Sequence, residues 1–261
     1  MKIVAIIQAR MSSTRLPGKV LMPLVGKPVL WHVVNRIRAC KTIAEVVVAT
    51  STDVTDDVIE TWCRGADVSS YRGDLNDVLD RYYQAGLIHA ADIVVRITAD
   101  CPVVDPTIVD EVVRGYLAGG YDFYGLSGEF PDGLDCTVFA FNALARAWRE
   151  AALPSEREHV GPYIEKHPEM FKSGGFTKFT GLSHHRWTLD EPRDYEFLQV
   201  VFWFNPLFWL SKKSIKLNHE FLADRGALEN DSDVYHYQNI LLSYASSTDH
   251  AALESPFNYS L

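Results

Sequence analysis

Short apolar runs and longer stretches of helical periodicity alternate along the first half of the chain. Apolar residues fill positions 3–7 and 46–49, and all of 93–97 except Arg96, and such runs are typical of strands buried on both faces of a parallel sheet. Between the runs, apolar residues recur every three or four positions, which predicts helices. These helices are expected from near Pro28, around Val58–Trp62, around Val78–Tyr83 and from Asp105-Pro106, a good N-cap followed by proline.

The second half of the chain has a weaker pattern. Residues 121–135 are rich in glycine, proline and aspartate and are expected to form a long surface loop. Strands are then expected at 135–141 and 185–189, with helices around 142–152 and 156–166. The chain therefore predicts an α/β fold with a mostly parallel sheet and helices on both faces. We expect one domain over residues 1–205 and an accessory C-terminal region, 206–261, packed on it.

Composition and charge narrow the class of protein. The chain has 261 residues, 47% of them hydrophobic, enough to bury the core of one large domain. The formal net charge of -9 argues against general nucleic-acid binding, which needs a basic face. The four cysteines form no CxxC pair, and the start of the chain has no signal-peptide pattern. The apolar run 200–210 is broken by Asn205-Pro206 and is too short to span a bilayer, so we expect a cytoplasmic protein.

The segment after the first predicted strand carries the strongest chemical signal. Residues 9–19 hold the cations Arg10, Arg15 and Lys19, several hydroxyls and Gly18. Arginine and lysine donors between a strand and a helix are what a polyphosphate requires. The segment is not a Walker P-loop, because it lacks the earlier glycine and the following Ser or Thr of that motif. The alternative interpretation is a solvated basic loop.

Two aspartates follow predicted strands and are candidate metal ligands. Asp100 directly follows the run 93–97 and precedes Pro102, and Asp190 stands before Pro192. Carboxylates at the carboxyl edge of a sheet lie where open α/β folds bind ligands, and Mg²⁺ prefers carboxylate and phosphate oxygens. Each also has a structural interpretation, since Asp100 can bond the turn before Pro102 and Asp190 can cap a helix.

Weaker candidates are polar residues in later segments. Arg72 and Asp77 could touch a base or ribose, although an ordinary capped helix explains Asp77 as well. A polar acceptor could be bound by Asp132, Asp135, Glu156, Arg157 and His159. For Glu156, Arg157 and His159, the alternative explanation is a solvated helix start with a capping box from Ser155 to Glu158.

Six ordered segments give the chain a specific resemblance. They are QARMSSTRLPGKVL, RGDLNDVLDRYYQA, RITADCPVVDP, DGLDCTVF, SEREHVGPYI and RWTLDEPRDYEFL. Together, over about residues 2–200, the chain resembles the cytidylyltransferase family of spore coat polysaccharide biosynthesis protein F. It is similar, more distantly, to CMP-KDO and CMP-sialic acid synthetases. The resemblance implies a Rossmann-like nucleotidyltransferase fold, also that of nucleotide-diphospho-sugar transferases, with CTP, Mg²⁺ and a homodimer.

The resemblance also assigns residues. The nucleotide-phosphate loop would contain Arg10, Ser12, Arg15 and Lys19, with Ala9 near the base. Asp100 and Asp190 take the positions of the family's metal ligands, and Glu156, Arg157 and His159 fall in the segment that faces the acceptor. Thr98-Ala99 replace the Gln-Gly of the synthetases, and Gly161 stands where a hydroxyl residue is expected.

The reaction expected from the resemblance is transfer of CMP from CTP to an anionic sugar or sugar acid. Arg10, Lys19, Asp100 and Asp190 would carry the catalysis, with Mg²⁺ between the two aspartates. One alternative is a glycosyltransferase of the same fold, which needs a DxD motif after a strand. The triplet Asp231-Ser232-Asp233 lies instead in a late polar segment. The other alternative is a non-catalytic nucleotide binder.

Overall fold

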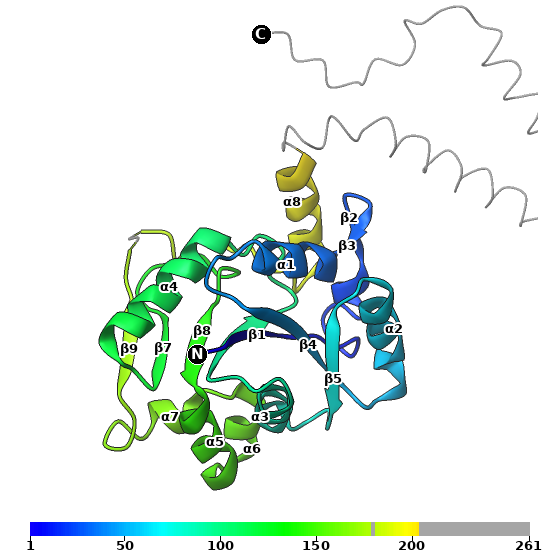
Figure 1. Ribbon diagram of the computed structural model, residues 1–261. Coiled ribbons are helices and arrows are strands. Elements are labelled where there is room, and N and C mark those ends of the chain that lie inside the picture. Colours follow the sequence, from blue (N-terminus) through cyan, green and yellow to red (C-terminus); the bar gives the residue numbers. More distant parts are fainter. Residues whose placement is uncertain (179–180, 204–261) are drawn as a thin grey trace, which may run out of the picture. The chain divides into compact units, whose positions relative to one another are not determined.

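The computed structural model describes residues 1–178 and 181–203, and the prediction of an accessory region at 206–261 lies outside this part. A seven-stranded sheet has the order β5-β4-β1-β6-β8-β7-β9 (Figure 1). The strands are β1 (Ile3–Gln8), β4 (Glu45–Ser51), β5 (Ser69–Gly73), β6 (Ile93–Thr98), β7 (Phe123–Leu126), β8 (Thr137–Ala140) and β9 (Ser173–Phe176). Every pairing in this sheet is parallel except those of β8, which is antiparallel to β6 and β7.

Helices cover both faces of the sheet, as the apolar runs predict. One face packs against α1 (Val29–Arg38), α2 (Asp57–Gly65) and α4 (Pro106–Gly119). The other packs against α3 (Val78–Ile88), α5 (Phe141–Glu150), α6 (Pro154–His159) and α7 (Pro162–Glu165). The central strands β1, β4 and β6 are buried on both faces because alternate residues of each strand enter the two cores.

The remaining elements are short or lie at the edge of the domain. Two 3-10 turns, η1 (Lys19–Leu21) and η2 (Val54–Asp56), follow β1 and β4. The strands β2 (Pro23–Leu24) and β3 (Lys27–Pro28) form a separate hairpin. The helix α8 (Pro192–Trp203) packs Leu198 and Phe202 in a small core with Leu24, Val29 and Leu189. None of the described helices is both long and apolar enough to cross a bilayer.

The helix α4 shows how the local sequence sets an element. The Asp105 side chain accepts hydrogen bonds from the backbone N–H groups of Thr107 and Ile108, and Pro106 opens the first turn. The helix ends at Gly120, whose φ of 58° is a left-handed conformation that glycine adopts without strain. The start of the helix at Pro106 confirms the prediction made from Asp105-Pro106.

Several predictions for the second half were wrong. The expected loop at 121–135 contains β7, which is held by hydrogen bonds to β8 and β9 rather than by its own composition. The expected strand at 185–189 is irregular apart from an isolated bridge between Arg186 and Asp132. The helix expected over 156–166 is broken at Val160 into α6 and α7. The polar strands β5 and β9 were not expected at all, because neither has an apolar run.

The sheet topology brings three loops to one edge. Gln8, the last residue of β1, pairs with Ala49 of β4 on one side and Thr98 of β6 on the other. The segments that follow these strands therefore leave the sheet side by side, at the carboxyl edge where open α/β folds bind ligands. The basic segment, the turn η2 and Asp100 all lie at this edge.

Candidate active site

The basic segment after β1 is a compact loop held by its own backbone. The carbonyl of Met11 accepts hydrogen bonds from the N–H groups of Ser13 and Gly18, at 2.9 Å each. Gly18 has a φ of 73°, and a side chain there would press on the end of Met11 at 3.3 Å. The loop therefore needs glycine at this point, and the chain enters η1 at Lys19.

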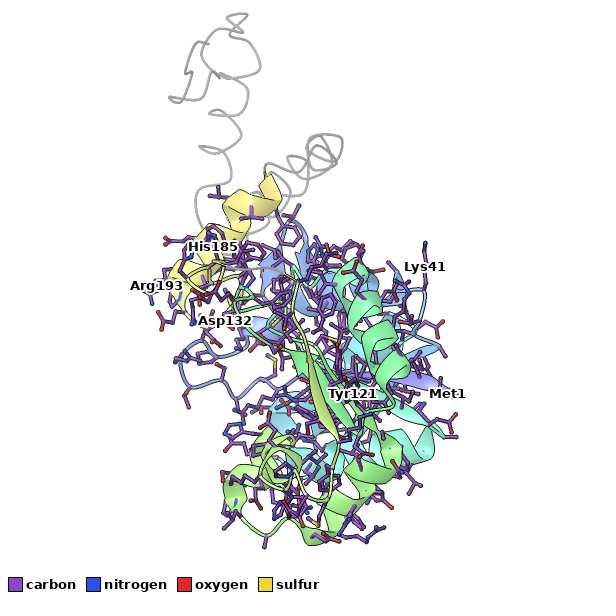
Figure 2. The ribbon with its side chains drawn as sticks, turned by 90° about the vertical axis from the view of Figure 1, so that its left-hand side faces the viewer. Met1, Lys41, Tyr121, Asp132, His185 and Arg193 are labelled. Carbon is purple, nitrogen blue, oxygen red and sulfur yellow. The ribbon has the colours of Figure 1, made fainter. Side chains whose placement is uncertain are left out.

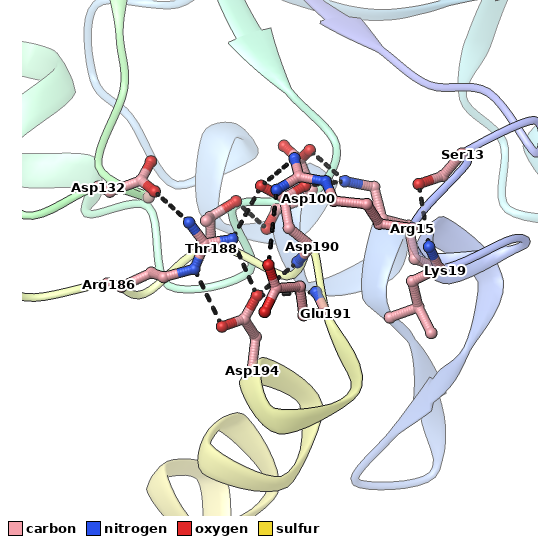
Figure 3. A network of polar contacts seen from close by, with 12 residues as sticks. Ser13, Arg15, Lys19, Asp100, Asp132, Arg186, Thr188, Asp190, Glu191 and Asp194 are labelled. Carbon is pink, nitrogen blue, oxygen red and sulfur yellow. Dashed lines mark hydrogen bonds and ion pairs between the residues drawn. The ribbon is translucent and has the colours of Figure 1, made fainter.

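Lys19 is the centre of the site. Its side chain is only 10% exposed, and its Nζ lies 2.6 Å from a carboxylate oxygen of Asp100 and 2.6 Å from one of Asp190 (Figure 3). Twice this distance is the greatest possible separation of the two oxygens. The two predicted metal ligands are thus brought together from segments about a third of the chain apart, around one positive charge.

Main-chain hydrogen bonds explain why the two aspartates converge. The N–H of Leu189 donates to the carbonyl of Asp100 at 2.8 Å, and the Thr188 hydroxyl donates to the same carbonyl at 3.3 Å. The segment before Asp190 is therefore fixed to the end of β6. These bonds replace the strand predicted at 185–189.

Positive charge surrounds Asp190. Burial alone raises the pKa of its carboxyl, but Lys19, Arg15 and Arg186 together hold the pKa below its ordinary value. Arg15 approaches Asp190 to 2.8 Å and Arg186 approaches it to 3.1 Å. The carboxylate is therefore ionised at neutral pH and stays available as a ligand.

Arg186 links the site to α8 and to the loop after β7. Its guanidinium donates to both carboxylate oxygens of Asp194, at 3.0 and 3.1 Å, and to Asp132 at 3.4 Å. Asp194 in turn accepts from the backbone N–H groups of Asp190 and Glu191. Figure 2 shows Asp132 and His185 beside α8, and the N–H of Asp132 donates to the His185 carbonyl at 3.1 Å. Arg186 thus orients the segment that carries Asp190.

These residues line a polar cavity of about 210 Å³. Its walls include the predicted residues Arg10, Arg15, Lys19, Asp100 and Asp190, together with Gln8, Ser13, Thr14, Thr98 and Ala99. The structure therefore gathers the three predicted cations and the two predicted carboxylates around one cavity. Of the other phosphate-loop predictions, Ser12 is exposed and outside the cavity wall, where Ser13 and Thr14 stand instead, and Ala9 is buried beneath the loop.

Two predicted nucleotide-binding residues are engaged elsewhere. Arg72 pairs with Asp57 and Glu60 and donates to the carbonyls of Ser51 and Asp53. Asp77 caps α3 by accepting from the Asp80 N–H. Both residues support the loops behind the cavity and are not on its wall.

The predicted acceptor residues are scattered. Arg157 binds Asp77 through two of its nitrogens and donates to the Trp148 carbonyl. Glu156 is buried, pairs with Lys166 at 3.2 Å and accepts from the Leu153 N–H, so the cap begins at Leu153 and not at Ser155 as predicted. His159 is exposed and lines a second cavity. Asp135 accepts from the Gly133 N–H within its own turn, and Asp132 meets Arg186.

Asp56, which was not predicted from the sequence, anchors the basic loop after β1. Its carboxylate is fully buried and accepts from the Met11 N–H at 2.7 Å and from the N–H and hydroxyl of Ser51. It ties the start of the loop to the end of β4. The position after an apolar strand was the available signal, although Asp53 and Asp57 share it.

The site fits a divalent cation that is shared with a substrate. In the described part of the chain, no cluster of three or more His, Cys, Asp or Glu side chains is arranged to hold a metal ion. Asp100 and Asp190 supply two hard oxygen ligands, and a Lys19 ammonium stands between them as a cation. Mg²⁺ in nucleotide sites uses one or two carboxylates together with phosphate oxygens and water.

Comparison with known proteins identifies the family and the fold. The cytidylyltransferase family matches residues 4–207. The chain belongs to the cytidylyltransferase family. Among solved structures, a cytidylyltransferase from Leptospira borgpetersenii is 34% identical, has a TM-score of 0.75 and covers 84% of this chain and 96% of its own. The Rossmann-like nucleotidyltransferase fold expected from the resemblance is confirmed.

Two curated relatives show how far this cytidylyltransferase is similar to named proteins. Spore coat polysaccharide biosynthesis protein SpsF of Bacillus subtilis is 34% identical over 209 residues, 77% of this chain and 86% of the relative. The 3-deoxy-manno-octulosonate cytidylyltransferase of Geobacter metallireducens is 33% identical over 118 residues, 45% of this chain and 46% of the relative. The resemblance stated from the six segments is confirmed.

Proposed function

We propose that this cytidylyltransferase transfers CMP from CTP to an anionic sugar or sugar acid and releases pyrophosphate. The observation that supports it most is the meeting of Lys19 with Asp100 and Asp190 on the wall of one polar cavity. A cluster of cations beside paired carboxylates suits a nucleoside triphosphate, whose transfer needs positioning and charge stabilisation more than covalent chemistry. The name of the Geobacter relative supports a sugar acid as the acceptor.

The residues of the loop would bind and orient the triphosphate. Arg10 and Arg15 offer planar forks of donors, and Lys19 offers a point charge. Charge builds on the departing pyrophosphate during transfer, and these donors, fixed by the loop backbone, would stabilise it. Asp100 and Asp190 would hold Mg²⁺, which when bound neutralises phosphate charge and lowers the pKa of a ligated acceptor oxygen.

Lys19 has a double part in this proposal. Without substrate its single ammonium pairs with both carboxylates and, together with Arg15 and Arg186, keeps the pKa of Asp190 low despite its burial. With substrate, its flexible stem lets the ammonium turn toward the phosphates of the same cavity. Mg²⁺ as the particular metal, the homodimer and the cytoplasmic location stay predictions.

The test is release of pyrophosphate from CTP with Mg²⁺ and a panel of sugar acids, with each other nucleoside triphosphate as a comparison. Asp100→Asn and Asp190→Asn should each lower turnover on the order of 10²–10³-fold, as the loss of a preorganised electrostatic group does. Asp92→Asn is the matched control, because Asp92 is 59% exposed and pairs with the chain's first residues. Near-normal turnover in either aspartate variant would contradict the proposal.

The alternative functions give different products. A glycosyltransferase would release a nucleoside diphosphate from a nucleotide sugar and no pyrophosphate from CTP. The DxD triplet at Asp231–Asp233, which that alternative would need, lies outside the described residues. A non-catalytic binder would show a rise in melting temperature with CTP but no turnover with any acceptor.

A further inference from the structure

A second cavity of about 240 Å³ lies on the sheet face that α3 and α5–α7 cover. Its wall includes Arg96, Phe123, Thr137, His159, Gly161 and Glu165. A cationic fork, a hydroxyl, a carboxylate and an aromatic ring around one space are suited to a small polar ligand with an apolar side. Since a water takes roughly 30 Å³ in the liquid, the cavity can admit a solute the size of a sugar ring.

Arg96, on the wall of this cavity, has a buried guanidinium nitrogen that no group in the described part of the chain bonds. Its Nε is buried and has no hydrogen bond, and within residues 1–178 and 181–203 no carboxylate forms an ion pair with its guanidinium. By contrast, Arg72, Arg157 and Arg186 each bind at least one carboxylate. Leaving a half-buried cation unpaired costs stability, because its lost hydration is not replaced. An anion that entered the cavity would recover that cost.

The backbone at the wall of the cavity is strained. Val160 has a φ of 70° and a ψ of -52°, and the Gly161 N–H donates to the His159 carbonyl at 2.8 Å. This is a γ-turn of the rare, strained kind, and valine is poorly suited to positive φ. The Val160 side chain is fully buried in the core, which fixes the turn. The turn ends α6 and brings His159 and Gly161 to the cavity, and such strain is concentrated at functional sites.

The second cavity and the polar cavity around Lys19, called the phosphate cavity after the proposed function, are both lined by residues of β6. Arg96 and Thr98 are two residues apart, so their side chains lie on the same face of the sheet, about 7 Å from one another along the strand. Thr98 lines the phosphate cavity, and Arg96 lines the second cavity. An acceptor that spans this distance would have its reacting oxygen near Asp100 and its anionic group near Arg96.

We infer that the second cavity is the acceptor site and that Arg96 binds the carboxylate of a sugar acid. The guanidinium forms paired, charge-assisted hydrogen bonds with that carboxylate. Thr137, His159 and Glu165 offer partners for sugar hydroxyls, and the Phe123 ring packs on the apolar face of the sugar. This inference rests on the proposed function for the identity of the acceptor, but its binding step is independent of turnover.

The experiment measures binding of 3-deoxy-manno-octulosonate to the full chain by calorimetry, in wild type, Arg96→Met and Arg96→Lys. We expect Arg96→Met to weaken binding at least about tenfold, as loss of one charged hydrogen-bonding partner does, and Arg96→Lys to weaken it less. The primary amide of the same sugar should bind weakly to wild type and equally weakly to Arg96→Met. Arg64→Met is the matched control, because Arg64 is 78% exposed on α2.

Two further measurements separate binding from structure and from catalysis. Arg96→Met should melt no lower than wild type, since it removes an unpaired cation, and should keep its CTP-induced rise in melting temperature. The inference would be overturned if wild type and Arg96→Met bound the acid equally, or if wild type did not bind it. It would also be overturned if Arg96→Met weakened binding of the amide as much as binding of the acid. Arg96-dependent binding without pyrophosphate release would uphold the inference and contradict the proposed transfer. Pyrophosphate release by Arg96→Met with an unchanged KM for the sugar acid would support the proposed transfer and contradict the inference about Arg96.

Discussion

The backbone N–H of Leu189 donates to the carbonyl of Asp100 at 2.8 Å. This bond joins the residue before one candidate metal ligand to the other candidate ligand itself, so the two aspartates are positioned by main chain as well as by side chains. Backbone geometry is less easily lost than a surface ion pair, because each buried N–H and C=O must keep a partner. The pair is therefore a preorganised feature of the fold.

Gly133→Ala should disrupt this arrangement. Gly133 has a φ of 107°, and an added Cβ would lie 2.5 Å from the carbonyl carbon of Trp187 and 2.6 Å from the Thr188 nitrogen. The backbone segment that leads to Asp190 would therefore have to move. We expect a loss of about 1–3 kcal/mol in the free energy of unfolding and a fall in turnover. Gly26→Ala is the control, since its φ is 73° but nothing lies within 4 Å. Equal effects in both variants would show that the close contact is unimportant.

Lys19→Met should separate the two roles of Lys19, which are to bind the phosphates and to pair with Asp100 and Asp190. Turnover should fall on the order of 10²–10³-fold, because a donor to the transferred phosphates is lost. Without its largest source of opposing charge, the pKa of Asp190 should rise, since burial is then less opposed. Mg²⁺ should raise the melting temperature of Lys19→Met more than that of wild type, because the two carboxylates are left without their cation. Lys41→Met, an exposed lysine, is the control. A smaller Mg²⁺ effect in Lys19→Met would contradict the shared cation site.

Asp56→Asn should loosen the phosphate loop. The buried carboxylate accepts from three donors on Met11 and Ser51, and an amide would present a donor to one of them. We expect a loss of about 1–3 kcal/mol in the free energy of unfolding, as for an unsatisfied buried group, and a higher KM for CTP. Asp53→Asn, three residues earlier, is the control because Asp53 is only partly buried and caps η2. An unchanged KM for CTP would show that the loop does not depend on this anchor.

The free energy of unfolding should fall at acid pH because Asp194 becomes protonated. Burial raises the pKa of this carboxyl, but Arg186 and the N–H groups of Asp190 and Glu191 together hold it below the ordinary value of 3.8. A lowered pKa contributes stability that is present above the ordinary value and is lost as pH falls through the lowered value. Urea unfolding should therefore show wild type losing stability below about pH 3.8.

Arg186→Met tests the source of that dependence. It should lower the free energy of unfolding by about 1–3 kcal/mol at pH 7, because Asp194 is left buried without its ion pair. Its loss of stability on acidification should be smaller than that of wild type, because without Arg186 the pKa of Asp194 lies less far below the ordinary value of 3.8. The same difference between the two proteins at pH 7 and pH 3 would contradict this account.

Much of the fold follows from local patterns. The strands β1, β4 and β6 were predicted from apolar runs because central parallel strands are buried on both faces. The strand β5 was missed because it is at the edge of the sheet and its sequence, SSYRG, is polar. The strand β9 was missed for a similar reason, since SGGF has little apolar surface. In each case the strand is formed by hydrogen bonds to a neighbouring strand that is distant in the sequence, and not by the composition of the segment itself.

For the same reason, some residues of the candidate site could be predicted from the sequence and others could not. Charge and position along the chain were enough to single out Arg10, Arg15, Lys19, Asp100 and Asp190. The partners of other polar residues depend on segments far apart, such as Arg157, which binds Asp77 across 80 residues. A charged residue in a sequence does not show whether it faces a ligand or another side chain. Only the structure shows that Arg157 binds Asp77 and that Arg96 lines a cavity.

The sequence alone determined most of the alternation of strand and helix in the first half, the basic charge of the segment after the first strand and the choice of two aspartates as candidate metal ligands. These are local properties, fixed by burial periodicity and by the chemistry of neighbouring residues. Only the tertiary structure decided which polar groups are neutralised by a partner, that Lys19 stands between Asp100 and Asp190, and that no carboxylate of residues 1–178 and 181–203 pairs with Arg96. Those facts depend on the order of strands in the sheet, which brings together residues that no local pattern connects.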